Sequence, residues 1–177
     1  MSAPRVIGLG CRLNIAESER IGAMAGEAED LVVVNSCSVT GEAVRRTRQA
    51  IRRARRAYPD ARLLVTGCAA ETERAELAAM PEVDGLVPNA EKLLARHYGA
   101  APVRPLPSKT GRTRAFVAIQ NGCDHACTFC IIPQGRGASR SLTIPAVLAE
   151  IEQALERGAA EIVLTGVDVT SWGADLP

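Results

Sequence analysis

Short aliphatic runs alternate with longer amphipathic stretches in the first half of the chain. The apolar runs lie at residues 5–9, 31–35 and 62–66, and a weaker one lies at 85–87. Their length and composition are those of buried β-strands, and helical patterns follow the first three. This alternation predicts a small α/β domain with a parallel sheet.

The clearest amphipathic stretch begins near Thr40 and has apolar or small residues at helical spacing. These positions form one stripe: Val44, Thr47, Ile51, Ala54 and Tyr58. A shorter helix is expected at residues 89–98. We therefore assign residues 1–98 to one N-terminal domain.

Residues 99–113 differ in composition from the segments on both sides. Proline and glycine gather there, at Gly99, Pro102, Pro105, Pro107 and Gly111. This composition is typical of a linker, so the second unit is expected at residues 114–177.

The second unit is predicted to contain a strand at residues 114–120, a cysteine-rich segment, a helix and a strand at 161–165. The helix begins after Thr143 and ends at Gly158. Its apolar face is Val147 or Leu148, Ile151 and Leu155. A unit of this size buries little surface alone. Either it packs against the first domain or the chain is the front part of a longer protein.

Composition narrows the class of protein. Hydrophobic residues make up 47% of the chain and aromatic residues 3%, so the core must be mainly aliphatic. The formal net charge of +1 indicates no general class of partner. Because we find no transmembrane run and no signal peptide, we expect a cytoplasmic protein without membrane contact. Six cysteines in a reducing compartment predict metal binding rather than disulfides.

Cys123, Cys127 and Cys130 have the spacing C-x3-C-x2-C. Three thiolates so placed can hold three irons of a [4Fe–4S] cluster and leave the fourth iron open for chemistry. The alternative is a structural zinc site with His125 as the fourth ligand.

Cys11, Cys37 and Cys68 form another trio, the first in chain order, although they are far apart in the sequence. Each follows a predicted parallel strand. Because the carboxyl ends of parallel strands share one edge of the sheet, we expect one metal site there. Zinc is the less favoured ion, since this half lacks the C-x2-C pairs usual in structural zinc sites.

The run CDHACTFCIIP, which starts at Cys123, resembles the radical S-adenosylmethionine (SAM) enzymes, because an aromatic residue precedes the last cysteine. Together with the upstream trio, it resembles their methylthiotransferase branch. The runs CSVT from Cys37 and LTGVD from Leu164 resemble the members that modify threonylcarbamoyladenosine in tRNA. The alternatives are the branches for isopentenyladenosine tRNA and for a ribosomal-protein aspartate.

This resemblance implies two [4Fe–4S] clusters, one on each trio, and SAM as the cofactor. It implies transfer of a methylthio group to C2 of the adenine, with tRNA, an electron donor and a sulfur source as partners. The fold would be the N-terminal domain followed by the start of a partial TIM-like barrel. Members continue for a few hundred residues, so the chain alone is expected to be inactive.

Further residues are candidates for binding. Four are expected to contact SAM: Arg136, Thr165, Gly166 and Asp168. A set of arginines on the helix after Thr40, with Glu42 as the only acid close in sequence, is a candidate RNA contact. These are Arg45, Arg46, Arg48, Arg52, Arg53, Arg55 and Arg56. The rival hypothesis is a non-catalytic metal-binding module that docks RNA through this helix.

Overall fold

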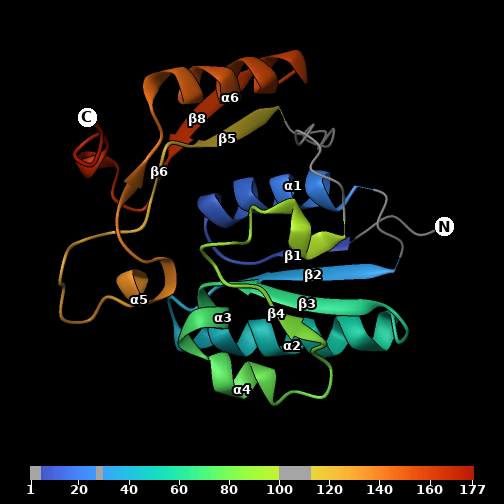
Figure 1. The fold of residues 1–177 in the computed structure, drawn as a ribbon. Helices are drawn as coiled ribbons and strands as arrows, with labels where there is room; N and C mark the ends of the chain where they lie inside the picture. Colours follow the sequence, from blue (N-terminus) through green and yellow to red (C-terminus); the bar gives the residue numbers. More distant parts are fainter. Residues whose placement is uncertain (1–4, 27–29, 100–112) are drawn as a thin grey trace.

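The structure is a computed structural model that describes residues 5–26, 30–99 and 113–177. The predicted linker, residues 99–113, lies outside these ranges except for its two end residues. The first part of the chain forms a parallel four-stranded sheet in the order β1-β2-β3-β4 (Figure 1). Its strands are β1 (Arg5–Gly8), β2 (Leu31–Ser36), β3 (Arg62–Gly67) and β4 (Gly85–Leu86).

Helices cover both faces of this sheet. They are α1 (Arg12–Ala25), α2 (Gly41–Ala57), α3 (Cys68–Thr72), α4 (Arg74–Ala78) and the 3-10 helix η1 (Ala95–Tyr98). In Figure 1, α1 lies on one side of the strands and α2, α3 and α4 lie on the other. The predicted α/β class is therefore confirmed.

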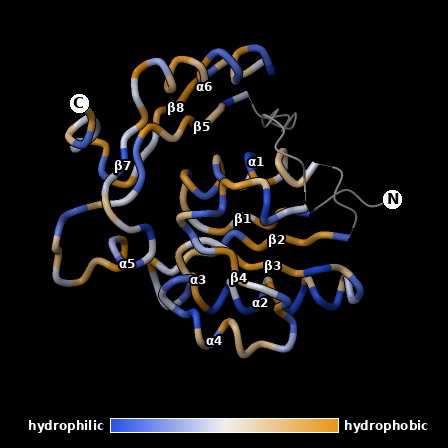
Figure 2. Tube along the Cα trace, in the orientation of Figure 1, coloured by the Kyte–Doolittle hydropathy of each residue, from blue (hydrophilic) through white to orange (hydrophobic). Residues whose placement is uncertain are grey.

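Alternation along the strands explains how both faces are filled. Val32 and Val34 of β2 pack with Ile51 of α2, whereas Val33 packs with Ile21 of α1. Successive side chains of a strand point to opposite faces, so a strand buried on both sides must be apolar throughout. Figure 2 shows β2 and β3 as continuous hydrophobic stretches between the two helical layers.

A smaller parallel pair follows, in which β5 (Arg114–Ala118) lies beside β8 (Glu161–Thr165). Helix α6 (Ile144–Glu156) packs on it and buries Val147, whereas Leu148 stays half exposed, so Val147 belongs to the apolar face. The remaining elements are β6 (Gln120–Asn121), α5 (Ile132–Arg136), β7 (Arg140–Ser141) and η2 (Val169–Ser171).

The two parts of the chain pack closely. Helix α1 contacts β1 on one side and β5 on the other, and α3 contacts α5 (Figure 1). The Arg20 guanidinium of α1 also lies 3.3 Å from the Glu150 carboxylate of α6. The expectation that the second unit packs against the first domain therefore agrees with these contacts.

Two predicted elements differ from the structure. Residues 89–93 form turns, and only Ala95–Tyr98 is helical. Lys92 and Tyr98 are both buried through contacts with α1 and do not share one helical stripe. The predicted strand at 114–120 is interrupted at Ile119, where its backbone N–H donates to Thr165 and its carbonyl accepts from Leu142. Among the described helices, none combines the length and hydrophobicity that a membrane span requires.

Candidate metal centre

The three N-terminal cysteines line one cavity of about 370 Å³. Cys11 precedes α1, Cys37 directly follows β2 and Cys68 is the first residue of α3. The parallel sheet brings these positions to the same edge, as the spacing predicts. The structure thus places the trio on a shared surface.

Glycines let the backbone approach two of these sulfurs. A side chain at Gly10 would bring its Cβ to 2.7 Å from the Cys37 sulfur, and one at Gly135 of α5 to 3.5 Å from the Cys68 sulfur. Gly67, with φ +91°, lies against the backbone of Ser36 at the point where β3 turns into α3. Only glycine combines this conformation with such close approach.

The second part of the chain supplies the opposite wall of the cavity. Ile131, Ile132 and Arg136 line it from the segment that follows the C-x3-C-x2-C motif. Thr165, Gly166 and Val167 line it from the end of β8. The cavity is therefore shared between the two parts of the chain, and Thr165 and Gly166, predicted to contact SAM, lie beside the first trio.

Asn14 fixes the strand ends around this cavity. Its Nδ2 donates to the Leu9 carbonyl at 2.6 Å and to the Ser36 carbonyl at 2.8 Å. Asn35 in turn donates to the Asn14 carbonyl at 3.1 Å. Because these amides are buried, their hydrogen bonds hold the loops after β1 and β2 in one arrangement.

A buried ion cluster of Glu17, Lys92 and Arg136 lies beside the trio. Lys92 Nζ is 2.6 Å from Glu17 Oε2, and Arg136 Nη1 is 3.0 Å from Glu17 Oε1. Burial raises the pKa of Glu17, but Lys92 and Arg136 outweigh it and leave that pKa below its usual value. The cofactor contact expected of Arg136 stays a prediction, since its guanidinium already binds Glu17, Asn14 and Asn121.

The second trio stands on the irregular segment between β6 and α5. The Cys130 N–H donates to the Cys127 carbonyl at 3.1 Å, and the Cys123 N–H donates to the Gly137 carbonyl at 3.1 Å. Phe129, between two of the cysteines, is 92% exposed. The segment is thus folded back on itself and presents Cys127 to solvent.

Gln120 ties this segment to the end of β8. Its buried side chain donates to the Gly122 carbonyl at 2.7 Å and accepts from the N–H groups of Val167 and Asp168, both at 2.9 Å. One amide therefore holds the entrance of the cysteine segment and the loop after β8 together.

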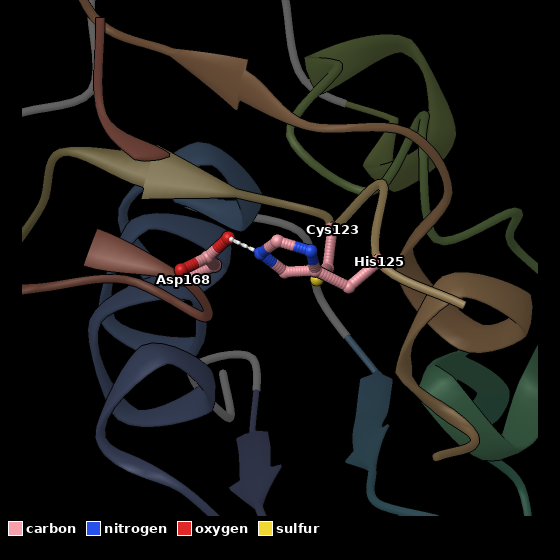
Figure 3. A group of neighbouring side chains, drawn as sticks. All are labelled: Cys123, His125 and Asp168. Atoms are coloured by element: carbon pink, nitrogen blue, oxygen red, sulfur yellow. Dashed lines mark ion pairs between the residues drawn. The ribbon is translucent and has the colours of Figure 1, made fainter. Parts of the chain in front are cut away.

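His125 of the cysteine segment pairs with Asp168 of the loop after β8. Nε2 of His125 lies 2.9 Å from Oδ2 of Asp168, and the ligand atoms of Cys123, His125 and Asp168 lie within 4.8 Å of one another (Figure 3). Hydrogen bonds from Ser171 and Thr170, with a smaller contribution from His125, lower the pKa of Asp168. The carboxylate is thus held ionised beside the cysteine segment.

The donor set of the cavity distinguishes the candidate metals. Its lining residues offer three thiol sulfurs and no carboxylate, imidazole or fourth cysteine. Structural zinc requires four ligands, whereas an iron–sulfur cube held by three cysteines keeps one open iron. The residues present therefore fit a cluster better than a zinc ion.

Nearby carboxylates balance part of the positive charge on the arginines of α2. Several arginines pair with acids, including some distant in sequence: Arg48 with Glu73 at 3.1 Å and Arg55 with Asp84 at 2.6 Å. Glu42, the acid close in sequence, pairs with both Arg45 and Arg46. The turns after α3 and α4 bring the further carboxylates to α2.

Five members of that set are exposed: Arg45, Arg46, Arg52, Arg53 and Arg56. Arg48 and Arg55 are half-buried. Arg45, Arg48 and Arg52 line a shallow groove beside Glu73. RNA contact by the whole set stays a prediction.

Replacing Arg55 by alanine is expected to lower the free energy of unfolding by about 1–3 kcal/mol. Arg55 donates to the carbonyls of Pro59, Ala61 and Glu82 and to Asp84, so truncation leaves several acceptors unpaired. The exposed neighbour Arg53→Ala is the matched control, with a change below about 0.5 kcal/mol. Urea denaturation of both variants measures the difference; equal effects would contradict a structural role for Arg55.

Sequence reasoning missed Glu17 and Lys92, although the chain carries a signal for the first. Glu17 falls in the apolar stripe of α1, between Leu13 and Ile21 at helical spacing. A carboxylate in a buried stripe indicates a buried cation nearby, but its identity is not readable from the sequence.

Comparison with known proteins agrees with this arrangement. Residues 5–88 match the family described as Uncharacterized protein family UPF0004, and residues 117–175 match the Radical SAM superfamily. The chain is 40% identical to the Threonylcarbamoyladenosine tRNA methylthiotransferase MtaB of Rickettsia prowazekii (strain Madrid E), over 97% of the chain and 45% of that protein.

Two further relatives cover the chain similarly. The protein of the same name from Bacillus subtilis (strain 168) is 38% identical over 95% of the chain and 44% of its own length. The tRNA-2-methylthio-N(6)-dimethylallyladenosine synthase of Chloroflexus aurantiacus (strain ATCC 29366 / DSM 635 / J-10-fl) is 33% identical over 96% of the chain and 41% of its own length. The chain thus spans less than half the length of these relatives.

The fold and the two matches define a radical SAM protein whose first part is a UPF0004 segment with its own cysteine trio. The chain belongs to the radical SAM methylthiotransferase family, as the resemblance of its cysteine motifs predicts.

Proposed function

We propose that this protein is part of a radical SAM enzyme that adds a methylthio group to C2 of N6-threonylcarbamoyladenosine in tRNA. The observation that carries the proposal is the shared cavity. Cys11, Cys37 and Cys68 line it together with Ile131 and Ile132, which directly follow the C-x3-C-x2-C motif. A second sulfur site facing the radical site is what a sulfur transfer requires.

Each trio has its own role in this proposal. Cys123, Cys127 and Cys130 would hold the radical SAM cluster, and Cys11, Cys37 and Cys68 would hold the second [4Fe–4S] cluster. When bound, these groups supply the radical that activates an unreactive aromatic C–H and the sulfur that replaces its hydrogen. Electrons and sulfur would come from a donor protein and a sulfur source.

The residues of this chain orient the partners and exclude water. Ile131, Ile132 and Val167 give the shared cavity apolar walls, which limit the access of water to a reactive intermediate. Thr165, Gly166 and Asp168 are proposed to bind SAM. The two hydrogen bonds from Val167 and Asp168 to Gln120 hold this loop in place before any ligand arrives.

The tRNA substrate and its modified base are supported by the names of the two relatives above 35% identity. The third relative carries the name of a dimethylallyladenosine enzyme, so the isopentenyladenosine branch is the alternative substrate. The ribosomal-protein branch is a further alternative. The exposed arginines of α2 are proposed to contact tRNA phosphates.

Anaerobic reconstitution tests the proposal. Extended to the length of the relatives above, the protein should bind about eight irons if both trios are loaded, and form 5′-deoxyadenosine when SAM and a reductant are added. Mass spectrometry of tRNA nucleosides then distinguishes methylthiolated threonylcarbamoyladenosine from the isopentenyl product. Protein that binds RNA but forms no 5′-deoxyadenosine would instead support a non-catalytic module, and zinc without iron would contradict the enzyme.

A further inference from the structure

An excess of positive charge is buried between the two parts of the chain, next to the first trio. Glu17 of α1, Lys92 from the turn before η1 and Arg136 of α5 are only 2%, 1% and 5% exposed. Glu17 is the one carboxylate bound by both cations. A buried ion is costly unless an opposite charge balances it, and within the part of the chain that the structure describes one of the two cations has no such partner.

The other side chains that contact Arg136 do not supply this missing negative charge. The Asn14 and Asn121 Oδ1 atoms, 2.6 Å and 2.8 Å from the guanidinium, belong to neutral amides. The remaining side-chain contact is the sulfur of Cys11, 3.9 Å from Nη2. A metal-bound cysteine is a thiolate, so a loaded trio would provide the negative charge that balances the cluster.

A second N–H donor approaches the trio from another direction. Asn89 Nδ2 lies 4.0 Å from the Cys68 sulfur and also donates to the carbonyl of Gly135, the residue before Arg136. Two of the three sulfurs therefore have an N–H donor, and both donors are fixed by α5. Hydrogen bonds and charges around cysteine sulfurs set the reduction potential of an iron–sulfur cluster.

We propose that Arg136, with Lys92 and Glu17, is a positioning and charge-balancing group for the cluster on Cys11, Cys37 and Cys68. This inference rests on the proposed second cluster. One arginine then links the two sites, because it follows the C-x3-C-x2-C motif in sequence and touches a ligand of the other trio in space. Its charge stabilises the more negative, reduced state of that cluster and raises its reduction potential.

The test measures the reduction potential of the second cluster alone. The background is the full chain with Cys123, Cys127 and Cys130 replaced by alanine, reconstituted without oxygen and titrated by electron paramagnetic resonance. Arg136→Met removes one positive charge. It is expected to change the ratio of oxidised to reduced cluster about tenfold in favour of the oxidised form, which lowers the one-electron reduction potential by about 59 mV.

Variants that change charge in opposite directions separate this role from a merely structural one. Glu17→Gln leaves two cations without a carboxylate and is expected to raise the potential. Lys92→Met makes the same change of charge as Arg136→Met without removing the Cys11 contact, so it should lower the potential less. It also keeps the test available if Arg136→Met does not fold.

Arg20→Met is the matched control. Arg20 also joins α1 to the second part of the chain, through Glu150, but its side chain is 33% exposed. Its removal should leave the potential unchanged. Unchanged potentials in Arg136→Met and Lys92→Met, or a shift of Glu17→Gln in their direction, would overturn the inference. A background protein that binds no cluster would overturn the proposed second centre as well.

Discussion

Alanine in place of Cys68 is expected to remove about half of the iron, from about eight to about four atoms per chain, because one cube loses a ligand. In a protein extended to the length of the relatives above, formation of 5′-deoxyadenosine should persist, since Cys123, Cys127 and Cys130 remain, while methylthio transfer should be lost. Iron analysis and absorption spectroscopy after anaerobic reconstitution measure the first effect, and nucleoside mass spectrometry measures the second.

Cys127→Ala is the matched control, with the opposite pattern of activity. It should lose a similar amount of iron and all formation of 5′-deoxyadenosine, because Cys127 belongs to the proposed radical site. Because Cys68 is buried and Cys127 is exposed, the free energy of unfolding is also measured for both variants without clusters. Iron content that is unaffected by Cys68→Ala would remove the case for a second cluster.

Glutamine in place of Glu17 is expected to lower the free energy of unfolding of the cluster-free protein by about 3–5 kcal/mol at neutral pH. Removing one member of a buried ion cluster has effects of this size, because the remaining charges stay buried without compensation. Here Lys92 and Arg136 would both remain, 1% and 5% exposed. Urea denaturation measures the change. An unchanged slope of the free energy of unfolding against urea concentration would show that the unfolded state is not altered.

Two further variants test whether the loss of stability comes from unpaired buried charge. Glu150→Gln, which breaks the exposed pair with Arg20, should cost at most about 1 kcal/mol. Adding Arg136→Met to Glu17→Gln should recover part of the loss, because one unpaired cation is removed.

The pH dependence has a defined sign. The folded-state pKa of Glu17 lies below its usual value, so its stabilisation is present above that usual pKa and is lost as pH falls through the folded-state pKa. The difference between wild type and Glu17→Gln should therefore shrink in acid. A loss below 1 kcal/mol at neutral pH would contradict the structural role of the cluster.

The strands of the first domain were predictable from continuous apolar runs, and its main helix was predictable from a helical period. β2 and β3 are apolar on both faces, and the buried residues of α2, Thr47, Ile51 and Ala54, all belong to the predicted stripe. The segment at residues 89–98 was not predictable in this way. Lys92 is buried against Glu17 of α1, and Tyr98 packs in one cluster with Ile21 of α1; no local period reveals either contact.

Much of the candidate centre was also readable, since strand order alone brings Cys11, Cys37 and Cys68 to one edge of the sheet. The arginines of α2 could not be sorted, because Glu73 and Asp84 reach them only after the chain has folded back. These carboxylates balance part of the positive charge that the sequence places on α2.

By itself, the sequence determined the α/β class, both cysteine trios and the family, because these depend on residue type, spacing and local period. Only the tertiary structure decided that Arg136 lies against Glu17 and Cys11. That pairing joins positions more than a hundred residues apart, and it forms because folding excludes water from these charges, which then need partners of opposite sign.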